Sequence, residues 1–447
     1  MKYSLVFLSI LMVLNFSCKR KESNLSLVQI TAHTDAIYDE LVNIRRDLHQ
    51  YPELAGHEKR TAQIVENYLL DLGLEVKKGF AGHGLVGILN GDKKGKKIAW
   101  RADMDAIDLR TMGSIHYPKS KNPGVAHLCG HDVHTTIGLG IAKVLSELKD
   151  QIDGTIYFIF QPAEETFLGA KTMVEDSLFH EINPDEIYGL HVFPTEVGTV
   201  GTKSDELFAY ERKLTVSFDK NLDATDFQSF FKTALELLAR HQPKSEPWSL
   251  ANLVHSELGV ESPSTIYTDY FIFNSKIKTF ENDESILFEA TFFETDADRL
   301  ASVPTYITDK ILNSEFAESY QSTLPLSGNP TVQNHTGLTE TCLQTLQNEF
   351  GAEHIRPFYG QIPYFNEDFI YFQRKVPGVM FLLGASNQEK GTLAMPHSPE
   401  FVVDESAIKY GVTYFSNLLA KRTGSKSTST SGLHTPWLAN ASNTNNH

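Results

Sequence analysis

The stretch TIYFIFQPAEE, residues Thr155–Glu165, combines a strand pattern with a pair of acids. Its first part, Thr155–Phe160, is rich in β-branched and aromatic residues, which predicts a buried β-strand. Two adjacent carboxylates, Glu164 and Glu165, follow within five residues of the end of that strand. Functional sites of open α/β sheets form outside the carboxyl ends of the strands. The stretch therefore predicts a sheet strand that carries acids at the functional edge.

The same pattern occurs at two other places. Lys97–Trp100 leads into Arg101–Asp105, and Glu186–Leu190 leads into His191. Strands and helices alternate to about residue 200, which is typical of a mostly parallel sheet with helices on both faces. We therefore expect an α/β fold in which residues from distant parts of the chain form one site at the sheet edge. A further histidine, His397, is expected to join them from near the C-terminus.

A dense group of metal-ligand residue types lies at Ala126–His134, which reads AHLCGHDVH. A thiol, three imidazoles and a carboxylate this close together suit a transition metal such as zinc or manganese. The alternative is a histidine-rich loop with one buried cysteine. The acids and histidines that follow strands elsewhere in the chain favour the metal interpretation.

Charge and cysteine content exclude several classes of protein. The chain has 447 residues and a formal net charge of −16, which argues against long-range attraction to nucleic acid or anionic lipid. Its three cysteines are Cys18, Cys129 and Cys342. If Cys18 is lipidated and Cys129 binds metal, only Cys342 remains, so no disulfide framework is expected. Cys342 lies in a helical pattern and is expected to be a small core residue.

The N-terminus resembles an export signal. Met1-Lys2 is followed by an apolar run, residues 5–14, that is short for a bilayer span. Ser17 before Cys18 fits a bacterial lipoprotein signal, whereas Asn15 does not fit the usual apolar position. Lipidation of Cys18 would anchor an exported protein in a bacterial cell envelope. The alternatives are an ordinary cleaved signal or an uncleaved anchor.

Periodicity suggests a catalytic domain in two segments, interrupted by a small α+β insert that could act as a lid or a dimerisation surface. The insert is expected where the pattern changes near Glu206, with a strand at 213–218, helices at 225–240 and 297–313, and two strands between them. The expected boundaries are a signal at 1–18, a tether at 19–30, catalytic segments at 31–206 and 313–421, the insert at 207–312, and a disordered tail at 422–447.

Six stretches together resemble a known family of amidohydrolases, in the order in which that family carries them. That family includes hippurate hydrolase, N-acyl-amino-acid amidohydrolase and the auxin-conjugate hydrolases, a branch of the two-metal aminoacylase/carboxypeptidase enzymes. The stretches are Arg45–Leu54 (RRDLHQYPEL), Arg101–Ala106 (RADMDA), Cys129–Asp132 (CGHD), Gln161–Glu165 (QPAEE), Gly189–His191 (GLH) and Pro396–Pro399 (PHSP).

The resemblance implies two divalent metal ions per chain, zinc or manganese, and a set of roles. The implied metal ligands are Cys129, His131, Glu165, His191 and His397, with Glu164 as the general base. A base takes the proton of a water molecule and passes it to the leaving nitrogen. We expect Asp103 and Asp105 to orient the ligands by hydrogen bonds, and we count Asp105 with Glu164 among the catalytic residues.

Purely structural roles remain the alternative for several of these residues. The Glu164–Glu165 pair could be a solvated helix start, and Asp103 and Asp105 could form an ordinary strand-end turn. Three histidines in family motifs, His49, His127 and His134, have no assigned role and could be structural. The segment Asn366–Phe369 also resembles a family segment and is expected to line the pocket.

The insert departs from the family pattern. Family members carry a Gly-Gly-His segment where this chain has Ser217–Ala224, which contains no histidine. An arginine that grips the substrate carboxylate is also lost near Phe292–Glu294. His241 and His255 are weak candidates for the missing histidine. Loss of an oxyanion donor costs about 10² to 10³ in turnover, so the chain could be a slower enzyme or one with a different substrate.

Two functions follow from this pattern. The first is a metal-dependent hydrolase that cleaves the amide bond of N-acyl amino acids or small peptides. The second is a non-catalytic metal-binding envelope protein that uses the altered insert for interaction. The resemblance also implies a homodimer formed through the insert.

Overall fold

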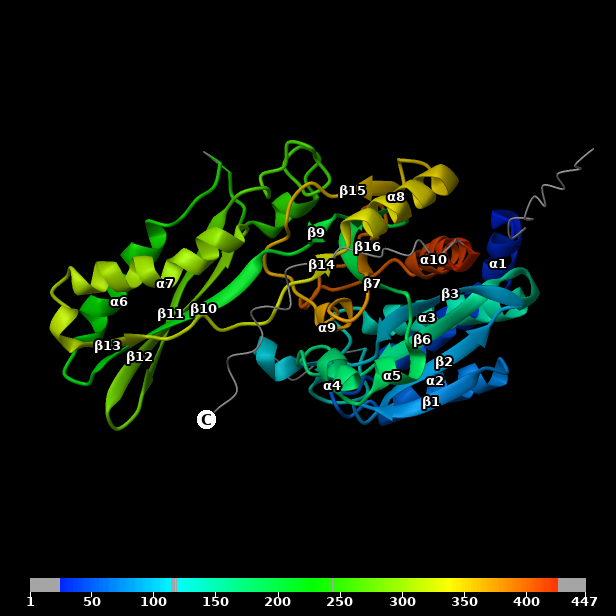
Figure 1. Ribbon diagram of the computed structural model, residues 1–447, viewed down its shortest axis with the longest axis horizontal. Coiled ribbons are helices and arrows are strands. Elements are labelled where there is room, and N and C mark those ends of the chain that lie inside the picture. The colour runs from blue at the N-terminus through cyan, green and yellow to red at the C-terminus, as the bar shows by residue number, and fades with distance from the viewer. Residues whose placement is uncertain (1–24, 114–116, 118, 243–244, 425–447) are drawn as a thin grey trace, which may run out of the picture.

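The computed structural model describes residues 25–113, 117, 119–242 and 245–424, which form two lobes (Figure 1). The larger lobe contains an eight-stranded sheet and the smaller one a four-stranded sheet. The expected signal with Cys18, and residues 425–447 of the expected tail, lie outside the described residues. Within the described ranges, no helix is long and apolar enough to cross a membrane.

The large sheet has the strand order β1-β2-β6-β3-β7-β16-β8-β15. Its four central strands, β6, β3, β7 and β16, run parallel, and antiparallel strands flank them on both sides. The expected α/β fold with a mostly parallel sheet is therefore confirmed. The strands are β1 (Glu75–Phe80), β2 (Gly84–Asn90), β3 (Lys93–Asp103), β6 (Asp153–Gln161), β7 (Glu186–Glu196), β8 (Val200–Thr202), β15 (Ile355–Pro357) and β16 (Gly378–Ser386).

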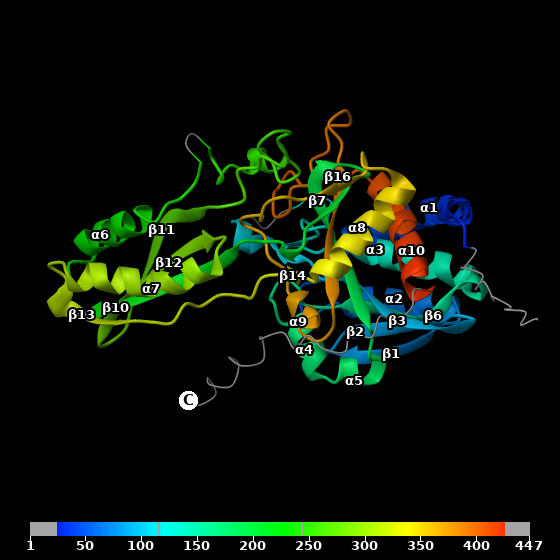
Figure 2. The same cartoon turned by 45° about the horizontal axis from the view of Figure 1, so that its top comes forward.

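Helices cover both faces of this sheet because its central strands are apolar on both sides. In β3, for example, Trp100 packs into the core on one face and Ala99 into the core on the other. Figure 2 shows the helices around the sheet. The first core includes α1 (Leu27–Gln50), α2 (Lys59–Asp71), α3 (His131–Glu147), α8 (Thr336–Phe350) and α10 (Ser406–Gly424); the second includes α4 (Gly169–Glu175), α5 (Leu178–Ile182) and α9 (Ile370–Gln373).

Strand register brings the carboxyl ends of the central strands to one level. Asp103 at the end of β3 pairs with Gln161 at the end of β6. Arg101 of β3 pairs with Gly189 of β7, so His191 lies at the level of Asp103. The strand-end residues that the sequence singled out are therefore neighbours in space, as expected of parallel strands.

The smaller lobe is an antiparallel sheet of order β11-β12-β10-β13, with two helices packed on one face. Aromatic rings fill its core; Phe218 and Phe227, for example, have centroids 4.1 Å apart. The expected insert ended at residue 312, but β13 pairs with β10 and carries the insert's sheet beyond that boundary. Its elements are β10 (Tyr210–Asp219), α6 (Ala224–Glu236), β11 (Phe271–Glu281), β12 (Ser285–Glu294), α7 (Ala297–Leu312) and β13 (Tyr320–Thr323).

Two short sheets complete the architecture. One pairs β4 (Ile107–Asp108) with β5 (Val125–Ala126), and the other pairs β9 (Asp205–Glu206) with β14 (Gln333–Asn334). The second sheet lies where the chain leaves the large lobe for the insert and where it returns. It therefore pairs the two segments that connect the large lobe with the insert.

Two expected boundaries shift for local reasons. The tether expected at 19–30 ends early because Ser26 and Gln29 form a capping box that starts α1 at Leu27, and Ile30 is already buried. The tail expected from residue 422 begins later, because the last helix extends to Gly424.

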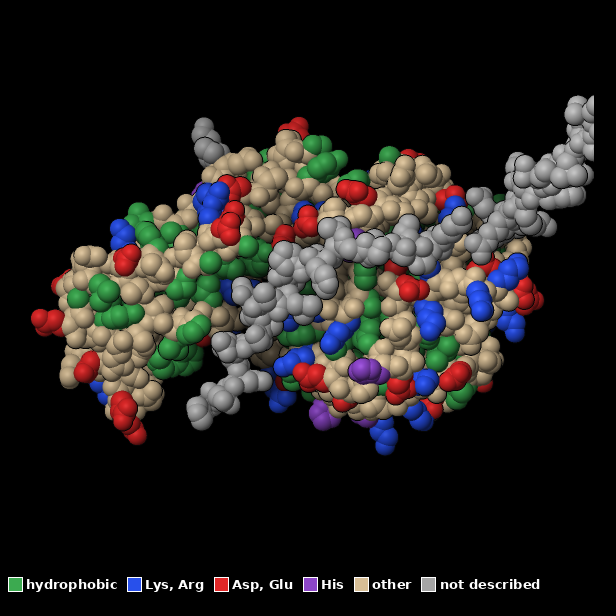
Figure 3. Space-filling view, in the orientation of Figure 1, with side chains coloured by type: hydrophobic (Ala, Val, Ile, Leu, Met, Phe, Trp, Pro, Cys, Tyr) green, Lys and Arg blue, Asp and Glu red, His purple; other side chains and the backbone are tan. Residues whose placement is uncertain are grey.

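Charges of both signs are interspersed over the face shown in Figure 3. Acidic and basic side chains lie side by side on both lobes, and no broad basic area covers this face. This surface agrees with the net charge of −16, which does not favour a polyanionic partner.

Candidate active site

A glycine turns the chain into α3 and separates two of the expected ligands. Gly130 has φ of +99°, and a Cβ there would lie 2.3 Å from Cγ2 of Val192. Both the left-handed backbone and the close approach therefore require glycine. This turn places Cys129 at the end of a loop and His131 at the first position of the helix.

Cys129 and His191 face one another. The Sγ atom of Cys129 lies 3.2 Å from Nε2 of His191. The other ring nitrogen of His191, Nδ1, donates a hydrogen bond to the carbonyl oxygen of Val192 at 2.7 Å. Burial holds the pKa of His191 well below its usual value, so the ring is neutral. A neutral ring whose Nε2 is free of its own proton is the form that binds a metal.

His131 directs its second nitrogen toward a group of carboxylates. Nδ1 lies 3.0 Å from Oδ1 of Asp105 and donates to it. Nε2 is buried without a hydrogen-bond partner among the described residues. It lies 3.8 Å from Oε2 of Glu164 and 3.9 Å from Oε1 of Glu165. Burial alone would lower the pKa of His131, but Asp103 and the other carboxylates raise it to about 10.

Glu165 and His397 connect the two segments of the catalytic lobe. Nε2 of His397 lies 3.2 Å from Oε1 of Glu165, 232 positions away in the chain. Burial would raise the pKa of Glu165, but the hydrogen bond from His397 lowers it. His397 has φ of +57° and is held by a bond from its backbone N–H to the carbonyl of Leu128, at 2.8 Å. Cys129 offers an atom to the same group.

His134 has both nitrogens engaged within the protein. Its Nε2 accepts a hydrogen bond from the backbone N–H of Val192 at 2.9 Å. The proton therefore resides on Nδ1, which donates to Oδ1 of Asp103 at 2.7 Å. In this arrangement His134 holds Asp103 and β7 in place and has no nitrogen free for a metal.

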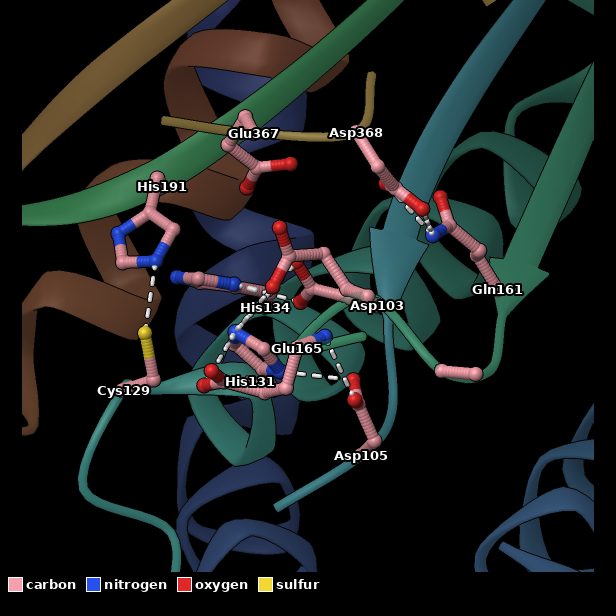
Figure 4. A network of polar contacts seen from close by, with 12 residues as sticks. Asp103, Asp105, Cys129, His131, His134, Gln161, Glu165, His191, Glu367 and Asp368 are labelled. Atoms are coloured by element: carbon pink, nitrogen blue, oxygen red, sulfur yellow. Dashed lines mark hydrogen bonds and ion pairs between the residues drawn. The ribbon is translucent and has the colours of Figure 1, made fainter. Parts of the chain in front are cut away.

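A buried arginine, Arg101, pairs with three carboxyl groups that Figure 4 labels, those of Asp103, Glu367 and Asp368. Its guanidinium is 2.7 Å from Oδ2 of Asp103 and 3.1 Å from carboxylate oxygens of Glu367 and Asp368. Gln161 accepts from Arg101 Nε at 2.7 Å and donates to Asp368 at 2.8 Å. Although burial alone would raise the pKa of Asp103, Arg101 and the nearby histidines hold it well below its usual value.

Glu164 is a buried carboxyl group of the site with a raised pKa. Its side chain is buried, and burial together with Glu367 and Glu165 raises its pKa well above the usual value. Glu164, Glu367 and Asp368 offer oxygens within 4.8 Å of one another. Such a group binds a proton readily, as a general base must.

The chemistry of the site fits divalent cations. Six carboxyl groups belong to this network, those of Asp103, Asp105, Glu164, Glu165, Glu367 and Asp368, and the buried Arg101 pairs with three of them. The unpartnered Nε2 of His131 points among them. A surplus of buried negative charge is costly unless cations compensate it. Thiolate, imidazole and carboxylate donors together suit zinc or manganese.

Four other histidines named in the sequence analysis, His49, His127, His241 and His255, are not among the expected ligands. Nδ1 of His49 lies 2.8 Å from Oδ2 of Asp132, behind the start of α3. His127 is buried, and burial lowers its pKa to about 3. In the insert, Nδ1 of His255 accepts from two backbone N–H groups of its own turn, and His241 packs edge-on against Trp248.

The structure brings together all five expected ligands and both expected aspartates. It also adds residues that the sequence analysis did not assign: Arg101, Gln161 and Glu58, the last of which accepts from the backbone N–H of Ala163. Arg101 carried a signal, because an arginine directly after the apolar run Ile98–Trp100 of a strand needs a buried partner. Asn366–Phe369, expected to line the pocket, contributes Glu367 and Asp368 to the carboxylate group.

Comparisons with known proteins find relatives along most of the chain. The model of peptidase family M20/M25/M40 matches residues 99–421. YhaA of Bacillus subtilis, named as an amidohydrolase, is 30% identical over 383 residues, which cover 85% of this chain and 94% of that protein. The IAA-amino acid hydrolase ILR1-like 5 of Arabidopsis thaliana is 30% identical over 443 residues, which cover 93% and 95%.

A solved structure shares the fold. The YXEP protein of Bacillus subtilis, described as a dinuclear metal-binding peptidase from the M20 family, aligns with a TM-score of 0.67. The alignment covers 87% of this chain and 99% of that one, at 24% sequence identity. At this identity the likeness supports the two-lobed fold and nothing finer.

Proposed function

The chain belongs to peptidase family M20/M25/M40, and from that premise we propose that it is a metal-dependent hydrolase that cleaves the amide bond of N-acyl amino acids or small peptides, with Glu164 as the general base. One observation carries the proposal: Glu164, which is buried and has a raised pKa, lies close to the metal-donor atoms of Cys129, His131 and Glu165. The relatives are named as hydrolases of this kind, which disfavours the non-catalytic alternative.

Five residues would hold the metal ions: Cys129, His131, Glu165, His191 and His397. Divalent ions held there would supply Lewis-acid chemistry, polarising the amide carbonyl and lowering the pKa of the attacking water. Zinc and manganese are the ions we propose, because the donor set mixes sulfur, nitrogen and oxygen. Asp105 acts through a ligand, because it holds His131, whereas Asp103 holds His134, which is not one of the five.

Glu164 moves the proton in this scheme. Its carboxylate accepts a proton from the attacking water, while a bond forms between the water oxygen and the carbonyl carbon. The same carboxyl group then gives the proton to the nitrogen as the carbon–nitrogen bond breaks. A carboxyl group with a raised pKa can serve both steps, since it holds the proton between them.

Replacement of Glu164 by glutamine tests this assignment. Turnover should fall by about 10² to 10⁴, the usual contribution of general acid–base catalysis, while metal content stays at the wild-type level. The panel would contain N-acetyl, N-benzoyl and indole-acetyl amino acids and small dipeptides. Glu175→Gln, at an exposed position in α4, is the matched control. Wild-type turnover in Glu164→Gln would remove Glu164 from the mechanism.

We also propose that the insert mediates a homodimer. In the order β11-β12-β10-β13, β11 is an edge strand, and edge strands readily pair with another chain. Phe280 on β11 is 48% exposed. Phe280→Glu should shift the mass measured by light scattering from dimer toward monomer. A wild-type monomer at micromolar concentration would contradict the proposal.

Export with lipidation at Cys18 is proposed on the sequence alone. The support is the apolar run at residues 5–14 followed by Ser17-Cys18. Expressed in a bacterium, the full chain should sediment with membranes and incorporate labelled palmitate, and Cys18→Ser should do neither. Unlabelled, fully soluble wild-type protein would contradict lipidation.

A further inference from the structure

The loop that carries the two glutamates is tightly folded. Ala163, directly before Glu164, has φ of +55°, a left-handed conformation that is unfavourable for a residue with a Cβ. The carbonyl of Ala163 accepts from the backbone N–H of Gly169 at 3.0 Å. A Cβ on Gly169 would lie 1.7 Å from the carbonyl oxygen of Pro162. Such a conformation persists only where surrounding groups hold it.

Glu58 is one of the groups that hold it. It lies directly before α2 and is fully buried. Its Oε1 accepts from the backbone N–H of Ala163 at 2.8 Å, 105 positions away, and from that of Gly56 at 2.9 Å. Its side chain makes no capping bond to its own helix. The carboxyl group of Glu58 therefore accepts hydrogen bonds from the distant loop and from its own turn, and none from α2.

The loop is fixed on both sides of Glu164. On one side, the N–H of Ala163 donates to Glu58. On the other, the N–H of Glu165 donates to Oδ2 of Asp105 at 2.9 Å. Asp105 also accepts from His131, whereas Glu58 contacts none of the five proposed ligands in the hydrogen bonds and ion pairs of the described chain. Glu58 is thus an anchor of the base that is independent of the metal ligands.

We propose that Glu58 is a positioning residue for the reaction: its carboxyl group holds Ala163 in the left-handed conformation and so directs the Glu164 side chain. The inference rests on the proposed role of Glu164. Burial and the nearby charge of Asp105 raise the pKa of Glu58 to about 7, so a neutral side chain is well tolerated at this position. Glutamine keeps an oxygen acceptor in the same place and should preserve the function.

Three variants separate positioning from stability. Glu58→Leu removes the acceptor at similar volume, and Glu58→Gln keeps it. Val65→Ala opens a cavity in the same helix without touching the loop, because Val65 is fully buried in the core under α2. Each would be studied as the metal-loaded full chain. If Glu58→Leu does not fold, Glu58→Asp replaces it, since the shorter side chain draws the acceptor away from Ala163.

We expect Glu58→Leu to lower kcat about 10²-fold, as small misplacements of catalytic groups do, with KM and metal content near wild type. Glu58→Gln should retain kcat within about 3-fold, and Val65→Ala should lower Tm but keep kcat. Wild-type kcat in Glu58→Leu, or an equal loss of kcat in Val65→Ala at matched Tm, would overturn the proposal. Equal losses in Glu58→Gln and Glu58→Leu would also overturn it.

Hydrogen exchange gives a readout that does not depend on activity. The peptide that spans residues 161–166 should take up deuterium faster in Glu58→Leu than in wild type or Glu58→Gln, because the Ala163 N–H loses its acceptor. Unchanged exchange would refute the positioning role. If Glu164→Gln proves fully active, the base assignment fails, yet the exchange result still decides whether Glu58 holds the loop.

Discussion

Nδ1 of His131 lies 3.0 Å from Oδ1 of Asp105, and this contact determines which atom of His131 faces the site. With the proton of Nδ1 donated to Asp105, Nε2 is left to point at Glu164 and Glu165. Asp105 also accepts from the backbone N–H of Glu165. One carboxylate therefore orients two of the proposed ligands.

Asp105→Ala should weaken metal binding about 10- to 100-fold, the usual cost of losing a group that orients a ligand. The affinity would be measured by titrating metal-free protein with zinc or manganese in a competing chelator. Asp108→Ala is the matched control, because Asp108 pairs with Arg110 at the surface of the same region. Wild-type affinity in Asp105→Ala would show that His131 needs no such partner.

Arg101→Leu should destabilise the protein by about 3 to 5 kcal/mol, because Asp103, Glu367 and Asp368 would lose their shared buried counter-charge. Urea unfolding followed by circular dichroism measures the change. In contrast, Arg110→Leu removes an exposed pairing and should leave the midpoint unchanged. An Arg101→Leu variant as stable as wild type would mean that these carboxyl groups are protonated together or hydrated in the fold.

The stability of the metal-free protein should depend on pH through Glu58. The folded pKa is about 7, above the ordinary value of 4.5. The contribution of Glu58 is therefore fully present below pH 4.5 and is lost as the pH rises through 7. The loss amounts to at most about 3 kcal/mol at pH 8.

Glu58→Gln has no such titration, so it is the comparison for that measurement. The free energy of unfolding of wild type minus that of Glu58→Gln should fall as the pH rises from 4.5 to 8. Groups common to both proteins cancel in the difference. A difference that is constant or rises with pH would contradict the raised pKa.

The sequence was sufficient for features that depend on local pattern. A β-rich run before Gln161, and another before Asp103, predicted strands whose ends carry acids, and parallel pairing then placed those ends together. The five implied ligands came from the resemblance, and part of their convergence could be expected because Glu165 follows β6 and His191 lies in β7, two strands of one sheet.

Features that depend on distant contacts could not be predicted. Arg101 donates to Glu367, 266 positions away in the chain, and Glu58 accepts from Ala163, 105 positions away. No local sequence pattern predicts either contact. The end of the insert was placed too early because β13 is a four-residue strand whose assignment depends on pairing with β10.

Metal removal and restoration test the central claim most directly. Protein treated with a chelator, then dialysed, would be assayed for release of free amino acid from the best N-acyl amino acid of the panel while zinc or manganese is added back. We predict no turnover in the metal-free protein, with activity returning and saturating at two ions per chain. Full turnover by protein shown to contain no metal would contradict the assignment of this site as a metal-dependent hydrolase centre.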